Sequence, residues 1–260
     1  MAENQYKMLV KVATLAGIIM LESNAESYRV ETTVERILSV SQLPIVDVFA
    51  NTTGLFITLD GPDFPEPITY VKRISQRSTH LTKIHDVNQI SRDMTSGQLS
   101  LREAYQKLNN VNRKTYSSKS TYLATVLLVM AFALLLGGNV HTFLLSGIAS
   151  LLLIVTYPIR DWLKLNDFIY GIFATMVVAI CMPFITRFVG SSDRALDITI
   201  ISVLMPLFPG TAFTNGFRDS FKGDYGAGVA KIVEALTIAV SLGVGVALGL
   251  FIAKGIMSRC

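Results

Sequence analysis

The sequence has few charged residues and few cysteines, and each shortage excludes a class of protein. Only 16% of the 260 residues are charged and 51% are hydrophobic, whereas about 25% charged residues is usual in a soluble domain. The two cysteines are Cys181, inside an apolar run, and Cys260, the last residue, so they give no disulfide framework. The composition therefore predicts a membrane protein and excludes a small disulfide-rich fold.

The charges that are present gather near the start of the chain. Residues 1–120 contain 14 of the 23 Lys and Arg and 12 of the 19 Asp and Glu. We therefore predict a polar domain over 1–119 and a transmembrane domain over 120–260. The opening "MAENQYKMLV" lacks the basic start and apolar run of a cleaved signal peptide. The net charge of +4 fits Lys and Arg at a cytoplasmic membrane surface better than nucleic acid binding.

The polar domain is expected to be α+β. Two apolar stripes at helical spacing predict two helices, the second beginning near Asn24: Met8, Val12, Leu15 and Ile19, then Val30, Val34 and Ile37. The runs "IVDVFAN" and "GLFITLD" predict a hairpin, and "ITYVKRI" a third strand. Residues 80 to 95 should be helical, and Ser100 with Glu103 forms a capping box for one more helix.

Long apolar runs follow from Thr121. A helix needs roughly 20 apolar residues to cross a bilayer, and five spans are expected near 121–137, 140–159, 168–186, 197–217 and 229–253. The fold class is thus a bundle of about five transmembrane helices preceded by a cytoplasmic α+β domain. We expect a multi-pass protein of the plasma membrane. The Lys and Arg residues beside the spans favour a cytoplasmic N-terminal domain, and an odd number of spans then places Cys260 outside.

The fourth expected span is interrupted. It contains Pro206 and Pro209, each of which removes a backbone donor. Irregular backbone at membrane depth must be buried in protein or line a wet cavity, and the polar residues Thr211, Thr214 and Asn215 follow. One interpretation is a solute site near the middle of the membrane, as in transporters with broken helices. The other is that the span ends at Phe208 and a cytoplasmic loop follows.

Two features mark the fifth span. Glu234 lies inside it, and an acid at that depth normally faces a cavity or a partner; Lys231, three residues earlier, is the expected partner. Anchoring near the headgroups and proton coupling are both compatible with this acid. The pairs Ala239 with Gly243 and Gly245 with Gly249 predict close helix packing, within the chain or across a subunit contact.

Signals for catalysis or cofactors are missing from the pattern. His80, His85 and His141 have no further ligand at metal-binding spacing, Ser23 and Ser27 lack a nucleophile elbow, and no Walker loop is present. We therefore expect no enzyme, cofactor or metal. A charged cluster at the first helix junction fits a solvated, salt-bridged face: Glu22, Glu26, Arg29, Glu31, Glu35 and Arg36.

Two long stretches resemble the hallmark motifs of the threonine/serine exporter family. They are "IMLESNAESYRVE" and "PLFPGTAFTNGFRDSFKGDYGAGVAKIVEAL", and the resemblance covers nearly the whole chain. Asn24 stands where the family usually has glycine, and Lys231 where arginine is common. The resemblance implies that the following residues bind the substrate or a coupling ion: Pro209, Gly210, Thr211, Thr214, Asn215, Arg218, Asp219, Asp224 and Glu234. Structural or gating residues are Glu26, Arg29, Glu31, Pro206, Gly223 and Lys231.

The resemblance implies a secondary transporter subunit that exports hydroxy amino acids such as threonine and serine, or small dicarboxylates. Full-length members of the family have a second group of about five spans. The resemblance therefore implies that a separate small membrane subunit supplies these spans here, and a higher oligomer is also compatible with the sequence. Two alternatives remain. A membrane-anchored hydrolase would need a nucleophile and a base in residues 1–120, and a regulatory or assembly subunit would tolerate loss of the polar residues near Pro209.

Overall fold

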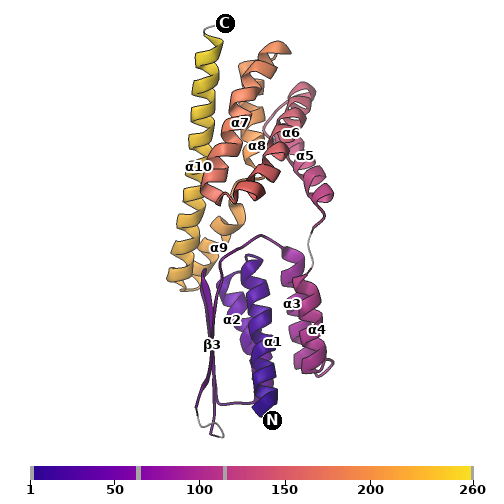
Figure 1. Ribbon diagram of the computed structural model, residues 1–260, viewed down its shortest axis with the longest axis vertical. Coiled ribbons are helices and arrows are strands. Elements are labelled where there is room, and N and C mark those ends of the chain that lie inside the picture. The colour runs from indigo at the N-terminus through magenta and orange to yellow at the C-terminus, as the bar shows by residue number, and fades with distance from the viewer. Residues whose placement is uncertain (1–2, 63–65, 114–115, 259–260) are drawn as a thin grey trace. The chain divides into compact units, whose positions relative to one another are not determined.

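The computed structural model describes residues 3–62, 66–113 and 116–258, and the chain forms two compact units (Figure 1). The mixed unit comprises residues 1–115 and 211–233, and the bundle unit comprises 116–210 and 234–260. The change of unit near residue 116 lies close to the expected boundary at 119. The return of residues 211–233 to the mixed unit was not expected from the sequence.

The mixed unit begins with the two predicted helices, α1 (Glu3–Glu22) and α2 (Ser27–Leu38), which a short 3-10 turn, η1 (Ser39–Ser41), follows. The predicted stripe of α2 is confirmed, because Val30, Val34 and Ile37 are fully buried. In α1 the same holds for Val12 and Ile19, while Met8 and Leu15 are partly buried against the core. These stripes contribute to one apolar core that also includes residues of the strands and of the later helices.

A three-stranded antiparallel sheet follows, in the order β1 (Ile45–Ala50), β2 (Gly54–Asp60), β3 (Ile68–Arg73). The predicted hairpin and third strand are confirmed. Leu55, Ile57 and Leu59 of β2 are buried, as strand alternation requires for one face. The helices α3 (Leu81–Thr95) and α4 (Leu101–Asn112) pack on the other side of α1 from the sheet (Figure 1). The capping box of Ser100 and Glu103 is present at the start of α4.

The junction of α1 and α2 corrects one prediction. Helix α2 begins at Ser27 with Glu26 at the N-cap, two residues later than the expected N-cap at Asn24. Asn24 instead has φ of +63°, in the left-handed region. Asn and Gly are the residues that adopt this conformation at lowest cost, which explains why asparagine is tolerated at this junction.

The bundle unit contains α5 (Ser118–Leu135), α6 (Val140–Leu163), α7 (Asp167–Phe188), α8 (Asp193–Leu204) and the greater part of α10 (Tyr225–Met257). Among the described residues, four helices are long and apolar enough to cross a membrane, namely α5, α6, α7 and α10. The chain is thus a multi-pass membrane protein by length and composition of its helices. The turn between α5 and α6 is tight, with Gly137 at φ of +83°.

The fourth expected span, 197–217, is not one helix. Its first part is α8, which ends at Leu204, and its last part is α9 (Gly210–Phe221), which belongs to the mixed unit. Pro206 and Pro209 lie in the connection between the two helices, where neither can donate a backbone hydrogen bond. The alternative is wrong about a loop, since the residues after Pro209 form a helix, but α8 does end before Phe208 and residues 211–233 belong to the mixed unit.

The small residues of α10 pack against α7. A side chain at Gly245 would reach 2.4 Å from the carbonyl oxygen of Ile172, and one at Gly249 would reach 2.8 Å from that of Met176. The hydroxyl of Thr175 also donates to the carbonyl of Leu242 at 3.1 Å. The Gly245 and Gly249 pair therefore serves packing within the chain. Gly243, in contrast, has open space around it.

Candidate functional site

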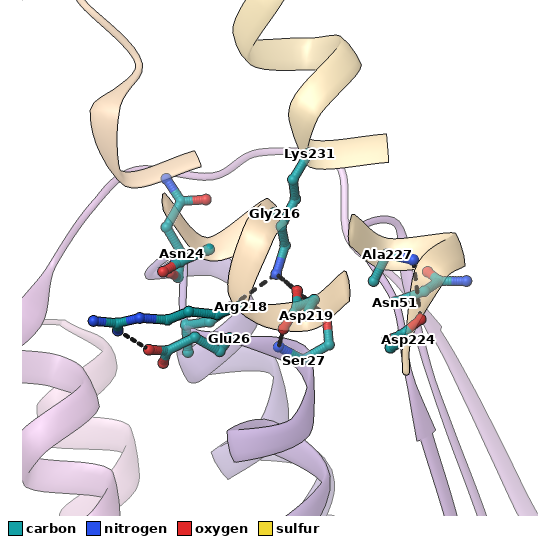
Figure 2. A network of polar contacts seen from close by, with 12 residues as sticks. Asn24, Glu26, Ser27, Asn51, Gly216, Arg218, Asp219, Asp224, Ala227 and Lys231 are labelled. Carbon is teal, nitrogen blue, oxygen red and sulfur yellow. Dashed lines mark hydrogen bonds and ion pairs between the residues drawn. The ribbon is translucent and has the colours of Figure 1, made fainter. Parts of the chain in front are cut away.

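The two hallmark stretches meet at a buried ion pair in the mixed unit (Figure 2). The Nζ atom of Lys231 lies 2.6 Å from Oδ2 of Asp219, and the two side chains are 5% and 0% exposed. Asp219 comes from α9 and Lys231 from the first turns of α10. Because each charge is removed from water, each depends on the other for stabilisation.

Asp219 also completes the start of α2. The N-cap residue Glu26 makes no capping bond with its own side chain. The backbone N–H of Ser27 donates instead to Oδ1 of Asp219 at 3.2 Å, and the Ser27 hydroxyl donates to Oδ2 at 3.3 Å. A carboxylate at a helix N-terminus satisfies unpaired N–H groups and suits the positive end of the helix dipole. Asp219 thus caps a helix that lies 192 residues away in sequence.

Lys231 has further acceptors at the same junction. Its ammonium donates to the carbonyl oxygen of Ala25 at 3.4 Å and to the hydroxyl of Ser27 at 3.3 Å. A lysine ammonium has three donors, and the described partners are Asp219, Ala25 and Ser27. The junction between α1 and α2 is therefore held to α9 and α10 through a fully bonded cation.

A second ion pair lies at the edge of the first. Oε1 of Glu26 accepts from Nη1 of Arg218 at 2.6 Å, and Oε2 accepts from Nη1 of Arg29 at 3.2 Å. The Glu26 side chain is only 6% exposed, whereas that of Arg218 is 58% exposed. The interpretation of this cluster as a solvated face is therefore wrong for Glu26, which is buried beneath its two arginines.

Hydroxyl and amide groups extend the contact beyond the charges. Nδ2 of Asn215 donates to the carbonyl oxygen of Asn24 at 2.8 Å. Nδ2 of Asn24 in turn donates to the Thr79 hydroxyl at 3.2 Å, and that hydroxyl lies 3.1 Å from the hydroxyl of Thr211. Residues of α9 thus bond to the helix junction and to the segment before α3.

Two glycines let α9 and α10 approach closely enough for this network. A side chain at Gly228 would lie 2.8 Å from the carbonyl oxygen of Gly216, and one at Gly216 would lie 2.8 Å from Ile232. The turn between the helices needs Gly223, which has φ of +90°. Asp224 then accepts from the N–H of Ala227 at 3.0 Å and caps the start of α10.

The outer face of α9 carries aromatic side chains. Phe213, Phe217 and Phe221 recur every four residues, and adjacent rings lie 5.1 Å and 6.3 Å apart. Phe217 and Phe221 are exposed, while Gly216 and Asp219 are buried. Helix α9 is therefore amphipathic, with its polar residues bonded inside the mixed unit.

Glu26 is held ionised at neutral pH. Burial raises its pKa, but a hydrogen bond from its own backbone N–H, the hydrogen bond from Arg218 and the charges of Arg29 and Arg218 lower it further, so the pKa lies below its ordinary value. A carboxylate with this shift favours the folded state above its ordinary pKa and loses that contribution as pH falls through the lowered value.

Glu31 has the opposite shift. Burial raises its pKa, the hydrogen bond from the Ala50 N–H at 2.8 Å lowers it, and the charges of Asp224, Glu35 and Asp219 raise it. The net shift is upward, so the folded state holds this proton more tightly than the unfolded chain does. Glu31 thus contributes stability below its ordinary pKa of about 4.5, and that contribution is lost as pH rises through the raised value.

The variant Glu31→Gln is expected to remove this loss. Its amide oxygen can still accept from Ala50, and it carries no charge to repel Asp219 and Asp224. Denaturant midpoints of the full chain, measured from about pH 4.5 to neutrality, should fall less for the variant than for the wild type. Glu26→Gln should show the opposite effect: relative to the wild type, it should lack the stability that ionised Glu26 contributes above its ordinary pKa. A slope unchanged by Glu31→Gln would contradict the assignment.

Most of the site residues expected from the sequence gather in this network, and some do not. Arg29, Glu31, Arg218, Asp219, Asp224 and Lys231 lie in it together with Glu26, Thr211 and Asn215. Pro206 and Pro209 lie in the connection before α9, Gly210 begins α9, and Thr214 is exposed on it. Glu234 lies in the α10 segment of the bundle unit. The ammonium of Lys231 donates to Asp219 at 2.6 Å, and its expected pairing with Glu234 stays a prediction.

Sequence reasoning missed the residues that act through the backbone or as small spacers. Ser27 was considered only as a nucleophile, yet its N–H and hydroxyl bind Asp219. Asn24 offers its carbonyl, Thr79 its hydroxyl, and Gly216 and Gly228 their lack of a side chain. The glycines had a signal, since both interrupt helices at positions where alanine would otherwise be favoured.

Within the described residues, no group of His, Cys, Asp and Glu is arranged to hold a metal.

Comparison with known proteins identifies the same family that the two hallmark stretches indicate. The ThrE family model, which describes threonine/serine exporters, matches residues 11–253. A "Probable threonine/serine exporter" of Mycobacterium tuberculosis (strain ATCC 25618 / H37Rv) is 22% identical over 237 residues. The alignment covers 89% of this chain and 44% of that protein, so the chain spans less than half the length of its relative. No solved structure matches. The family match extends over more than half of the sequence and includes every residue of the network, and the chain is a member of the threonine/serine exporter family.

Proposed function

We propose that this chain is a subunit of a secondary transporter that exports small polar metabolites, with hydroxy amino acids such as threonine and serine, or small dicarboxylates, as substrates. The observation that carries the proposal is the family match over residues 11–253, which runs through both hallmark stretches. Four helices with the length and apolarity of membrane spans support a carrier over a soluble enzyme.

The polar network is proposed to act as a gate and not as the solute site. Asp219 and Lys231 are buried and bonded to each other, to Ser27 and to Ala25, which leaves a solute no free charge to bind there. Arg218 and Arg29 are more accessible. A gate of this kind would link movement of α9 and α10 to the α1–α2 junction, as bistable charged contacts do in other switching proteins.

The proposed topology has five crossings with the mixed unit in the cytoplasm. Helix α8 has 12 residues, about 18 Å of helix, which is shorter than a hydrocarbon core of about 30 Å. We propose that residues 205–209 complete this crossing. The chain then leaves α10 on the external side. Cys260, which the sequence places there, lies outside the described residues.

A second membrane subunit is proposed to complete the transporter. The relative contains a large portion with no counterpart in the aligned region of this chain. A separate protein with about five spans would supply the remaining helices. Two halves with an odd number of spans insert in opposite orientations when they are joined, which gives the inverted repeat common in transporters.

Reconstitution tests this proposal. Liposomes preloaded with L-threonine or succinate would contain the purified chain, the complex that co-purifies with the chain from its own membrane, or no protein. We expect efflux from the complex and none above the empty liposomes from the chain alone. Full efflux from the chain alone would overturn the two-subunit proposal. Absence of efflux from the intact complex would overturn the transporter itself and favour a regulatory role.

A further inference from the structure

A cavity lies at one end of the bundle unit, where α5 leads into α6 and α7 leads into α8. Its volume is about 410 Å³, within the usual range of roughly 300 to 1,000 Å³ for small-molecule sites. Two loops and the first turns of two helices line it, and the lining includes Gly137, Asn139, His141, Ser191, Ser192 and Arg194. A free amino acid or a small dicarboxylate fits this volume.

The charge in the cavity is positive. Arg194 is the one lining residue with a permanent charge, and the lining contains no Asp or Glu. Among the described residues, its guanidinium has no carboxylate or other hydrogen-bond partner. Nη2 of Arg194 lies beside Gly137, where an added side-chain carbon would be 3.8 Å away. An arginine presents donors in the planar fork that matches a carboxylate.

Polar groups without permanent charge surround this arginine. Nδ1 of His141 lies 2.9 Å from the hydroxyl of Ser191. The side chains of Asn139 and Ser192 accept from the N–H groups of Thr142 and Ala195 and so cap α6 and α8. These capped helix ends already have their acceptors, so the attraction for an anion comes from Arg194. The hydroxyls and the imidazole are left to orient the remainder of a polar ligand.

We infer that this cavity binds the carboxylate of a small polar metabolite, with Arg194 as its charge partner. The inference rests on the proposed function and adds a place for the solute, separate from the buried network of the mixed unit. In the proposed topology, α5 is the first crossing after the cytoplasmic domain, so the end of the bundle with the cavity faces outward. The cavity is then the site from which an exported solute leaves.

Binding to the purified full chain in nanodiscs, measured by calorimetry, tests this inference directly. The ligands are L-threonine, succinate and L-threoninamide, which lacks the carboxylate. We expect saturable binding of at least one of the two carboxylates and at least about tenfold weaker binding of the amide, the equivalent of about 1.4 kcal/mol. The preference between threonine and succinate identifies the source of the carboxylate. Absence of carboxylate binding, or equal binding of threonine and its amide, overturns the inference.

Three variants separate the cavity from general damage. Arg194→Gln should weaken carboxylate binding about tenfold, whereas Arg194→Lys should retain part of it because the charge remains. Arg187→Gln is the matched control, since Arg187 is an exposed arginine in the last turn of α7 that does not line the cavity. Wild-type affinity in Arg194→Gln overturns the inference.

Efflux measured on the same preparations keeps this inference apart from the proposed function. Carboxylate binding that depends on Arg194, in a complex without efflux, supports the cavity and overturns the transporter. Normal efflux with carboxylate binding that is unchanged in Arg194→Gln supports the transporter and overturns the cavity. Loss of both binding and efflux in Arg194→Gln, but not in Arg187→Gln, supports both.

Discussion

An Asp219→Ala variant is expected to lose about 3–5 kcal/mol of stability in the mixed unit, the usual cost of removing one member of a buried ion pair. Lys231 would keep its charge at a site where it is 5% exposed, without the carboxylate at 2.6 Å. The start of α2 would also lose the acceptor of its Ser27 N–H. Hydrogen exchange of α2 and α9 in the full chain, in detergent, measures the loss.

The double variant Asp219→Ala/Lys231→Met distinguishes the ion pair from simple loss of a side chain. Removal of both charges leaves no uncompensated ion, so the double variant should be much more stable than the sum of the single losses predicts. Asp197→Ala, at an exposed aspartate of α8, is the control and should leave exchange in α2 and α9 unchanged. Additive losses would contradict the pairing of Asp219 with Lys231.

Local pattern was sufficient where a local interaction forms the element. The hairpin of β1 and β2, the third strand and the capping box of Ser100 and Glu103 are as predicted, because each depends on residues within a few positions of one another. The apolar stripe of α2 was also predicted correctly, because the helical spacing of its apolar residues indicates which face is buried.

Local pattern failed at α9 for a physical reason. Phe213, Phe217 and Phe221 gave residues after Pro209 the apolarity of a span, but hydropathy does not tell a face toward lipid from an exposed face of another unit. The polar residues between them bond to partners about 190 positions away, such as Glu26 for Arg218. Periodicity contains no information about a contact at that separation.

The partner of Lys231 shows the same limit. Glu234 lies three positions later and was the natural local choice, yet Asp219 of the preceding helix lies 2.6 Å from the ammonium. The close approach that brings them together depends on Gly216 and Gly228. The family resemblance found most of the polar residues of the network, and the structure was needed to show which of them bond to one another.

Reversal of either charge in the pair of Glu26 and Arg218 is expected to lower export at least tenfold. Glu26→Arg would place a third cation beside Arg29 and Arg218, and Arg218→Glu would replace the cation that pairs with a buried carboxylate by a second acid. Exchange of both residues restores opposite charges at the same positions. Arg218 is 58% exposed but Glu26 is only 6% exposed, so a reversed charge at Glu26 also lowers stability. A large loss of export at equal amounts of folded protein therefore indicates a role in the transport cycle.

The most direct test of the account is the export rate of threonine from cells that contain the proposed partner subunit and one of four forms of this chain: wild type, Glu26→Arg, Arg218→Glu or the double exchange. Immunoblots of the membrane fraction confirm equal amounts of each form. The account predicts that both single variants lose export and that the double exchange recovers most of it. Wild-type export in the single variants, or a double exchange as inactive as they are, would contradict the claim that the two hallmark stretches form one functional network.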